Sequence, residues 1–462
     1  MRFIRIVSPY HILVALLLIT FFLGGGARHD ISSLTLLRPL ACLAAAAGLL
    51  TLRADTLRNY RGLFILLGAL AFIMCIQLVP LPPSWWSALP GRSVIHQLDA
   101  AIGMPDAWRP ITFSPMKTAN ALASLVVPFA TLALFVQLDV RERDRILLLL
   151  VGIAVASALL GATQQLAGIS SGVYFYEITN RGSAVGLFAN RNHHAVFQCC
   201  ALLIALYLAC SSRDTRSTGG IIALLAAAAV LFVAILANAS RAGLICLSAA
   251  LAMTAVGLFR GFSANRNRQT LSLRLVSFAC FLAPTVTIFG LFAIGGRSPA
   301  LLRLLGDGEF AEYRAQVLPD LIEMASTFQP WGAGFGAFEY AFRPREPVEL
   351  LQPAYLNNAH NDWLQLAIEG GVPGLLVAMG AALLLTWQLV RLGRTPSGQE
   401  RGTIPVSWLG AAILLLLAIA SVVDYPLRVP SIMLLAIVAL GLVFPRDTQQ
   451  ELNNTSGTAL TH

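Results

Sequence analysis

One histidine stands where an acid–base group could act at a membrane surface. His360 is followed by Asn361 and Asp362, and a long apolar segment begins a few residues later. An imidazole titrates near neutral pH and can accept a proton from a hydroxyl group. We therefore predict His360 as a general base, with Asn361 and Asp362 as groups that could orient it or contact a sugar. The alternative is an interfacial histidine followed by a helix N-cap.

Arg314 could bind an anion. It lies within residues 309–328, where apolar residues at helical spacing predict a helix outside the membrane: Phe310, Val317, Leu318, Leu321, Ile322, Ala325 and Phe328. The same spacing places Arg314 on the apolar face, where a guanidinium must meet an anion or extend to water. We predict a phosphate site there, with an ion pair to Glu309 or Asp320 as the alternative.

Two further arginines lie at the edges of apolar segments. Arg241 occupies a very short turn between two of them, and Arg191 follows Asn190, a plausible helix N-cap. Arginine forms bidentate, charge-assisted bonds with anions such as phosphates, so we predict that Arg241 binds an anion and that Arg191 binds a diphosphate or a sugar. Contact with lipid headgroups is the alternative for Arg241. The adjacent His193 and His194 could suggest a metal, but successive helical residues point about 100° apart, and we predict no metal site.

The composition is that of a membrane protein. The 462 residues are 57% hydrophobic and 12% charged, whereas soluble domains carry about 25% charged residues. The net charge of +9 could suggest nucleic acid, but the arginines stand in short clusters between apolar runs, as in proteins oriented in a membrane. The seven cysteines lie within or beside apolar runs and predict packing residues rather than disulfides.

About twelve segments are long and apolar enough to span a bilayer, which needs roughly 17 to 25 residues per helix. The sequence thus predicts an all-α polytopic membrane protein with both termini in the cytoplasm, because arginine is denser in the loops that this orientation places inside. The predicted spans are 10–26, 34–52, 62–79, 118–138, 146–166, 193–210, 220–237, 243–259, 275–295, 367–390, 404–422 and 429–444.

The spans and loops predict four parts. Residues 1–295 form a membrane bundle with a Pro- and Trp-rich outer loop at 80–117. Residues 296–362 form a large outer loop with the amphipathic helix, 363–445 carry the last three spans, and 446–462 form a disordered cytoplasmic tail.

The distribution of acidic and glycine residues refines this interpretation. Asp362, Glu369 and Asp424 stand near segment ends, whereas ion-coupled transporters commonly keep acidic groups at the midplane of the membrane. This favours an enzyme, and a transporter or flippase of lipid-linked sugars stays open as an alternative. Gly371 and Gly374 predict close helix contact and a loosened first turn.

Four motifs in order resemble a known family. They are Ser240-Arg241-Ala242-Gly243, then Arg314, then Pro330-Trp331-Gly332-Ala333-Gly334-Phe335-Gly336, and His360-Asn361 followed after nine residues by Gly-x-x-Gly. Together they resemble the O-antigen ligase family, which includes O-antigen polymerases, over roughly residues 180–425. The resemblance implies a GT-C-like glycosyltransferase in the bacterial inner membrane with its active site on the periplasmic side.

The resemblance also implies a reaction. A glycan would move, with inversion, from polyprenyl diphosphate to an acceptor hydroxyl, without metal, cofactor or nucleotide sugar. Arg241 and Arg314 match the diphosphate-binding arginines and His360 matches the acceptor-activating histidine; Arg191 is our addition. Asn361, Asp362 and Trp331 could contact sugar or acceptor. Lipid A-core, a glycan or another hydroxyl could be the acceptor, and a polymerase that joins lipid-linked repeat units is the alternative to a ligase.

Overall fold

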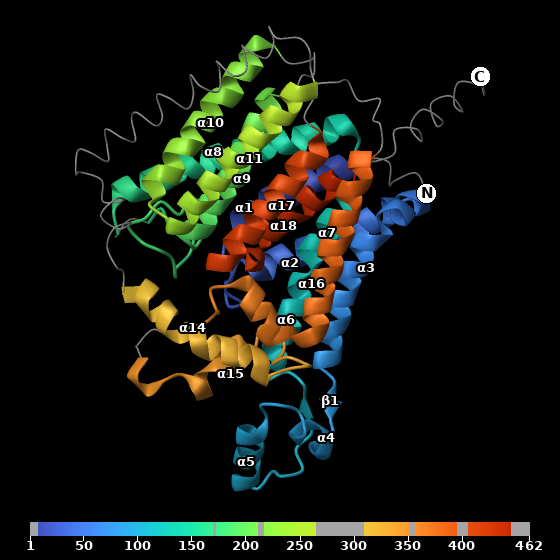
Figure 1. Ribbon diagram of the computed structural model, residues 1–462, viewed down its shortest axis with the longest axis vertical. Helices are drawn as coiled ribbons and strands as arrows, with labels where there is room; N and C mark the ends of the chain where they lie inside the picture. Colours follow the sequence, from blue (N-terminus) through green and yellow to red (C-terminus); the bar gives the residue numbers. More distant parts are fainter. Residues whose placement is uncertain are drawn as a thin grey trace.

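The computed structural model describes residues 8–169, 172–210, 217–264, 309–350, 356–394 and 405–444. Over these ranges the chain is helical apart from loops and one short antiparallel ribbon, in which β1 (Pro80–Leu81) pairs with β2 (Arg109–Pro110). The helices run roughly side by side in one bundle, and smaller elements gather at its lower end (Figure 1).

Eight of the described helices are long and apolar enough to cross a membrane, if the consecutive helices α6 and α7 are counted as one. They are α2 (Leu34–Thr51), α3 (Ala54–Gln77), α6 (Pro115–Ser124) with α7 (Val126–Phe135), α8 (Val140–Ala167), α9 (Arg191–Cys210), α10 (Thr218–Asn238), α16 (Asp362–Arg394) and α17 (Val406–Val423). Three shorter apolar helices are α1 (Pro9–Leu23), the first part of α11 (Arg241–Ala264) and α18 (Pro430–Val443).

An all-α polytopic membrane protein was the predicted fold class, and these helices confirm it. The eight long helices and the three short ones coincide with eleven of the twelve predicted spans. The remaining span, 275–295, lies outside the described residues, as does the predicted tail 446–462. The number twelve therefore stays a prediction.

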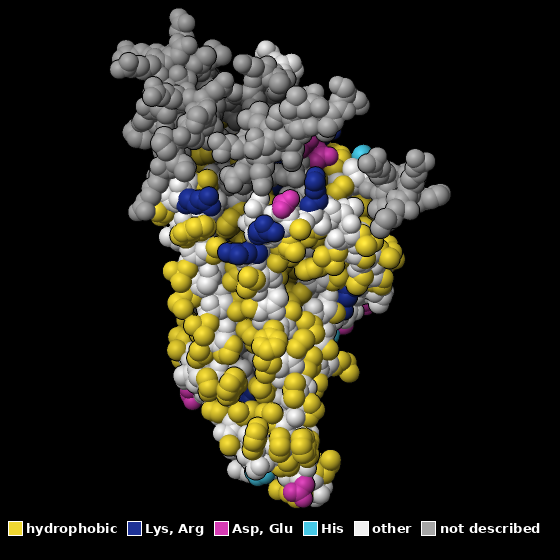
Figure 2. Space-filling view, turned by 90° about the vertical axis from the view of Figure 1, so that its right-hand side faces the viewer, with side chains coloured by type: hydrophobic (Ala, Val, Ile, Leu, Met, Phe, Trp, Pro, Cys, Tyr) yellow, Lys and Arg dark blue, Asp and Glu magenta, His cyan; other side chains and the backbone are white. Residues whose placement is uncertain are grey.

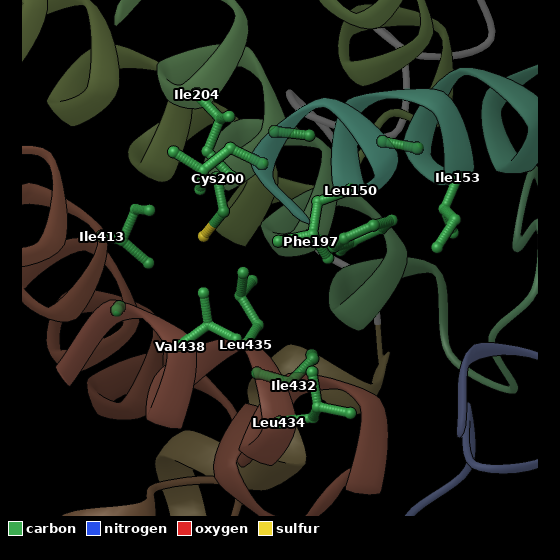
Figure 3. Packing of buried hydrophobic residues seen from close by; sticks show 14 of the residues in the cluster. Leu150, Ile153, Phe197, Cys200, Ile204, Ile413, Ile432, Leu434, Leu435 and Val438 are labelled. Carbon is green, nitrogen blue, oxygen red and sulfur yellow. The ribbon is translucent and has the colours of Figure 1, made fainter. Parts of the chain in front are cut away.

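The core of the bundle is a continuous apolar cluster between the spanning helices. Figure 3 shows part of this cluster, to which four helices contribute side chains. They are Leu150 and Ile153 of α8, Phe197 and Cys200 of α9, Ile413 of α17, and Leu435 and Val438 of α18. Cys200 is fully buried there as a free thiol, which agrees with the predicted packing role. The face of the bundle drawn in Figure 2 is also largely apolar, as contact with lipid requires.

Some helices begin and others finish at one end of the bundle, which we call the loop end. Ser33 donates from its hydroxyl to the Leu23 carbonyl, which joins the end of α1 to the start of α2. The Ser431 amide donates to the Gly24 carbonyl, and the Asn238 amide group donates to the Ala184 carbonyl. α9, α11 and α16 begin at this end, and α8, α10 and α17 finish there.

The smaller elements cover the loop end. The first loop contributes α4 (Pro83–Ser87) and α5 (Ser93–Ala101) beside the β1–β2 ribbon (Figure 1). The segment before α16 contributes α14 (Glu309–Thr327), α15 (Phe338–Phe342) and the 3₁₀ turns η2 (Arg343–Arg345) and η3 (Val348–Leu350). The turn between α17 and α18 contributes the 3₁₀ turn η4 (Pro426–Arg428). Buried Arg92 joins the two large loops, because its guanidinium donates to the carbonyl oxygens of Ile111 and Gly332.

α14 occupies the predicted extramembrane helix, with a different buried face. Its buried side chains are those of Tyr313, Val317, Leu321 and Met324, and with Phe328, directly after the helix, they pack with α15 and the start of α16. Leu318 and Ile322, which were predicted on the apolar face, are 43% and 57% exposed. That part of the prediction was wrong, because α15 and α16 pack against only one stripe of this helix.

Candidate functional site

Asp424 is the centre of a polar cluster at the loop end. It is the residue directly after α17, with an extended backbone, and its side chain is only 1% exposed. His360 reaches it from the turn before α16, where its own backbone is left-handed with φ 50°. A non-glycine residue rarely adopts this conformation. In it, the His360 imidazole points toward the end of α17, where Asp424 lies.

His360 lies between an anion and a cation. Its Nδ1 is 3.1 Å from Asp424 Oδ1, and its Nε2 is 3.4 Å from a terminal nitrogen of Arg314. A guanidinium can only donate and a carboxylate can only accept. Both contacts are therefore satisfied by a neutral imidazole that carries its proton on Nδ1 and presents the Nε2 lone pair toward Arg314.

Electrostatics maintain this protonation state. Burial lowers the pKa of His360, the positive charge of Arg314 lowers it further, and the hydrogen bond with Asp424 opposes both. Burial alone would raise the pKa of the Asp424 carboxyl, but the hydrogen bond from His360 and nearby positive charge hold it well below its usual value. A neutral imidazole beside an ionised carboxylate is the resting state of a general base.

The cluster extends to the first turns of α9 and α11. Asn192 donates from its amide to Asp424 Oδ2 at 2.8 Å, and Ser240 donates from its hydroxyl to Asn192 Oδ1 at 2.7 Å. Ser240 also caps α11 by accepting from the Gly243 amide. Arg191 and Arg241 are the first residues of these two helices. Two helix N-termini, which favour anions, therefore lie beside the His360 cluster.

Aromatic and imidazole rings form one wall of the cluster. The Tyr425 ring stands edge-on to His360 at 4.8 Å and to His193 at 5.1 Å. His193 Nε2 is 3.8 Å from Asp424 Oδ2, beyond hydrogen-bond distance. His194 points elsewhere, toward Gln198 and the Ala184 carbonyl. The two adjacent histidines thus serve separate surroundings, as their helical spacing predicts.

Asn361 and Asp362 contact protein groups. The Asn361 side chain accepts from the Leu364 amide, which is the N-cap role given above as the alternative. Asp362 accepts from the Ser421 hydroxyl and the Leu427 amide. It also lies 3.5 Å from Arg428. Asp362 therefore holds the start of α16 against the end of α17, while Asn361 caps α16 directly after His360.

A buried ion network surrounds Glu369 of α16. Glu369 is fully buried, and Arg428 donates to it at 2.8 Å. Gln365 donates to the same carboxylate and to Asn358. A buried carboxylate is tolerated when it is paired and hydrogen-bonded. The network ties the segment before His360 to η4, which follows Asp424.

Gly371 interrupts α16 close to this network. Its φ of 57° and ψ of −157° are non-helical, and the Val372 amide donates to the Pro330 carbonyl instead of continuing the helix. The turn at 330–336 packs into this break, where the Gln77 side chain donates to the Trp331 and Glu369 carbonyls. The loosened turn predicted at Gly371 is therefore a break in α16, and the turn at 330–336 of the large loop packs into it. The Trp331 ring is 45% exposed.

Replacing Gly371 with alanine is expected to destabilise the protein by at least about 2 kcal/mol. Its Cβ would lie 2.2 Å from the Pro330 carbonyl oxygen, in a backbone conformation that alanine avoids. The melting temperature of purified protein in detergent measures the effect. Gly380→Ala in the same helix is the control, because its Cβ would meet only Leu66 Cδ2, at 3.6 Å. Equal melting temperatures for the two variants would contradict the break.

Sequence reasoning missed two residues of this site. Asp424 was noticed only as an acidic residue near a span end, and Arg428 was not singled out. A usable signal was present: Asp424-Tyr425-Pro426 ends an apolar segment on the same predicted side as His360. The partner could not be read from it, because 64 residues separate the two side chains.

Comparison with known proteins adds one match. The family model described as O-antigen ligase matches residues 203–379. The matched region contains Arg241, Arg314, the turn at 330–336 and His360, and it ends before Asp424. No curated protein matches the chain.

Proposed function

We propose that the chain is a member of the O-antigen ligase and polymerase family, whose model matches residues 203–379, and that it moves a glycan from a polyprenyl diphosphate to an acceptor hydroxyl. The reaction would take place at the loop end, on the periplasmic side of the bacterial inner membrane, in a GT-C-like helical bundle. The observation that carries the proposal is the buried contact of His360 with both Asp424 and Arg314. This contact places a neutral imidazole beside a guanidinium at the point where α9, α11 and α16 begin and α17 ends.

His360 is the proposed base. The acceptor hydroxyl would give its proton to Nε2 while its oxygen forms a bond to the anomeric carbon of the glycan. Asp424, already bonded to Nδ1, would stabilise the imidazolium that results. The bond from the anomeric carbon to the diphosphate would break on the opposite side, and its electron pair would leave with the diphosphate. Attack opposite to the leaving group inverts the configuration.

The arginines are the proposed diphosphate site. Negative charge grows on the leaving diphosphate, and fixed positive groups lower the energy of that transition state. Arg314 lies beside His360, while Arg191 and Arg241 open α9 and α11, whose N-termini add positive dipole ends. The exposed Trp331 is a better sugar contact than Asn361 or Asp362, since both of these already bond to protein groups.

Glycan transfer by purified protein in lipid nanodiscs tests the proposal. The donor would be a polyprenyl diphosphate oligosaccharide, offered with lipid A-core or with a second lipid-linked repeat unit. Product on lipid A-core would make the protein a ligase, and a ladder of lengthened lipid-linked chains would make it a polymerase. Donor that binds without any product would overturn the proposal in favour of a lipid-linked sugar transporter.

Asp424→Asn is expected to lower kcat by about 10- to 10⁴-fold. An asparagine side chain can donate to Nδ1 and so favours the wrong tautomer of His360. The hydrogen bond with Asp424 raises the pKa of His360, so the variant should have a lower pKa. A base is active above its pKa, and activity is lost as pH falls through it. The acid limb of kcat/KM should therefore move to lower pH.

The pH profile separates this role from a structural one. If Asp424 only held helices together, the variant would lose rate equally at every pH. An unchanged acid limb would then contradict the assigned positioning role.

A further inference from the structure

A cavity lies beside the chain segments that flank His360, although His360 itself does not line it. It measures about 330 Å³ and opens between α2, α3, α6, α16 and the start of α18. α3, α6 and α16 stand next to one another in Figure 1. Its apolar wall consists of Leu34, Leu37, Leu70, Met74, Leu125 and Met433. Every one of these residues belongs to a spanning helix or the short loop beside it, so the wall has the chemistry of a hydrocarbon-binding groove.

The rim of this cavity is cationic. Arg28, Arg38, Lys117 and Arg428 line it, against the two carboxylates of Asp362 and Glu339. Three of these cations are paired with carboxylates, so the positive charge that could attract an anionic ligand is that of Arg38.

Arg38 is distinct among the four cations. Lys117 is 3.0 Å from Glu339, Arg428 is 2.8 Å from Glu369, and Arg28 is 2.6 Å from Asp30. The contact that the structure describes for Arg38 is instead with a neutral group, the Asn120 carbonyl oxygen at 3.4 Å. Arg38 lies in the first turns of a spanning helix and is half-buried. A cation in this position is costly unless it meets an anion or water.

The cavity is separate from the proposed diphosphate site and shares a wall with the base. Arg191, Arg241, Arg314 and His360 do not line it. Its lining includes Asn357, Asn358 and Asp362, on both sides of His360 in the chain, and Leu427 and Arg428, which follow Asp424. A molecule in this cavity would thus lie against the segments that position His360, and not against Arg191, Arg241 or Arg314.

We propose that this cavity holds the lipid anchor of a phosphate-bearing amphiphile, with its phosphate at Arg38 and its hydrocarbon chain along the apolar wall. The inference rests on the proposed function in one respect: the amphiphile is the acceptor. Donor and acceptor would then enter from opposite sides of the His360–Asp424 pair. A phosphate at Arg38 would supply the charge partner that the Asn120 carbonyl does not.

Direct binding of diphosphoryl lipid A tests the site without transfer. Native mass spectrometry of the full-length protein in detergent would count bound lipid for the wild type and for two variants. Arg38→Gln removes the charge and is expected to weaken binding about 10- to 100-fold, the effect of losing a charged hydrogen bond. Ala121→Phe fills the cavity from α6 and is expected to have a similar effect while leaving the charges in place.

Each variant has a matched control. Arg53→Gln removes an exposed arginine at the start of α3 that does not line the cavity, and Ala123→Phe adds the same ring to an exposed position of α6. Both are expected to bind lipid A like the wild type. Wild-type binding by Arg38→Gln and Ala121→Phe would overturn the site. Equal displacement of lipid A by phosphatidylglycerol or by inorganic phosphate would overturn its assignment to the acceptor.

Kinetics then connect the cavity to the reaction. Arg38→Gln is expected to raise the KM for lipid A-core about 10- to 100-fold while the KM for the donor stays unchanged. A rise in the KM for the donor instead would assign the cavity to the donor and overturn the inference. If no variant or wild type transfers glycan, but lipid A binding still depends on Arg38, the site stands and the proposed function falls.

Discussion

Replacing His360 with glutamine is expected to lower the kcat of glycan transfer by about 10²- to 10⁴-fold, the usual contribution of a general base. Glutamine keeps a polar side chain near Asp424 but has no group that accepts a proton at neutral pH. Donor affinity should stay near the wild-type value, because the arginines assigned to the diphosphate are intact. Single-turnover rates and donor binding, measured on the same preparation in nanodiscs, check both expectations.

A second histidine provides the control for that experiment. His96 lies on α5, in the small elements beyond the bundle (Figure 1), and His96→Gln should transfer glycan at the wild-type rate. Full activity of His360→Gln would remove the proposed base. Loss of donor binding in that variant, at an unchanged melting temperature, would instead move His360 into the donor site.

Arg314→Ala is expected to lower kcat by about 10²- to 10³-fold, as when one transition-state donor is lost. It should also change the pH profile in the direction opposite to Asp424→Asn. The positive charge of Arg314 lowers the pKa of His360, so its removal raises that pKa. Since the base must be neutral, activity would then be lost at a higher pH as the solution is acidified. Initial rates across the acid limb measure both effects.

Arg343 offers a matched control in the same loop. Its side chain is 51% exposed and pairs with Glu339, and exposed ion pairs contribute little to stability. Arg343→Ala removes the same charge and should leave kcat and the pH profile unchanged. Arg314→Lys should recover only part of the rate, since lysine restores the charge without the planar, bidentate guanidinium. An Arg314→Ala enzyme with wild-type rate and pH profile would exclude the proposed charge stabilisation.

The sequence by itself determined the features that depend on local composition. Apolar length identified the spanning helices, because a bilayer demands about 20 apolar residues wherever a helix crosses it. Helical spacing located α14 and placed Arg314 on the side of that helix that meets His360. Glycine at 371 indicated an irregular turn near the start of the predicted span 367–390, because glycine tolerates backbone conformations that other residues avoid. Each of these signals lies within a few residues of the feature it reports.

Only the tertiary structure decided which of these features meet. His360 and Asp424 are 64 residues apart, and Ser240 joins the cluster through Asn192, 48 residues before it. The hydrogen bond of Asp362 with η4 and the place of Arg38 in the lining of the cavity likewise depend on helices that are distant in the chain. Periodicity tells which face of a helix is apolar, and it contains nothing about which other helix covers that face or which helix ends converge. Packing of the whole bundle sets these neighbours, and with them the protonation state of the proposed base.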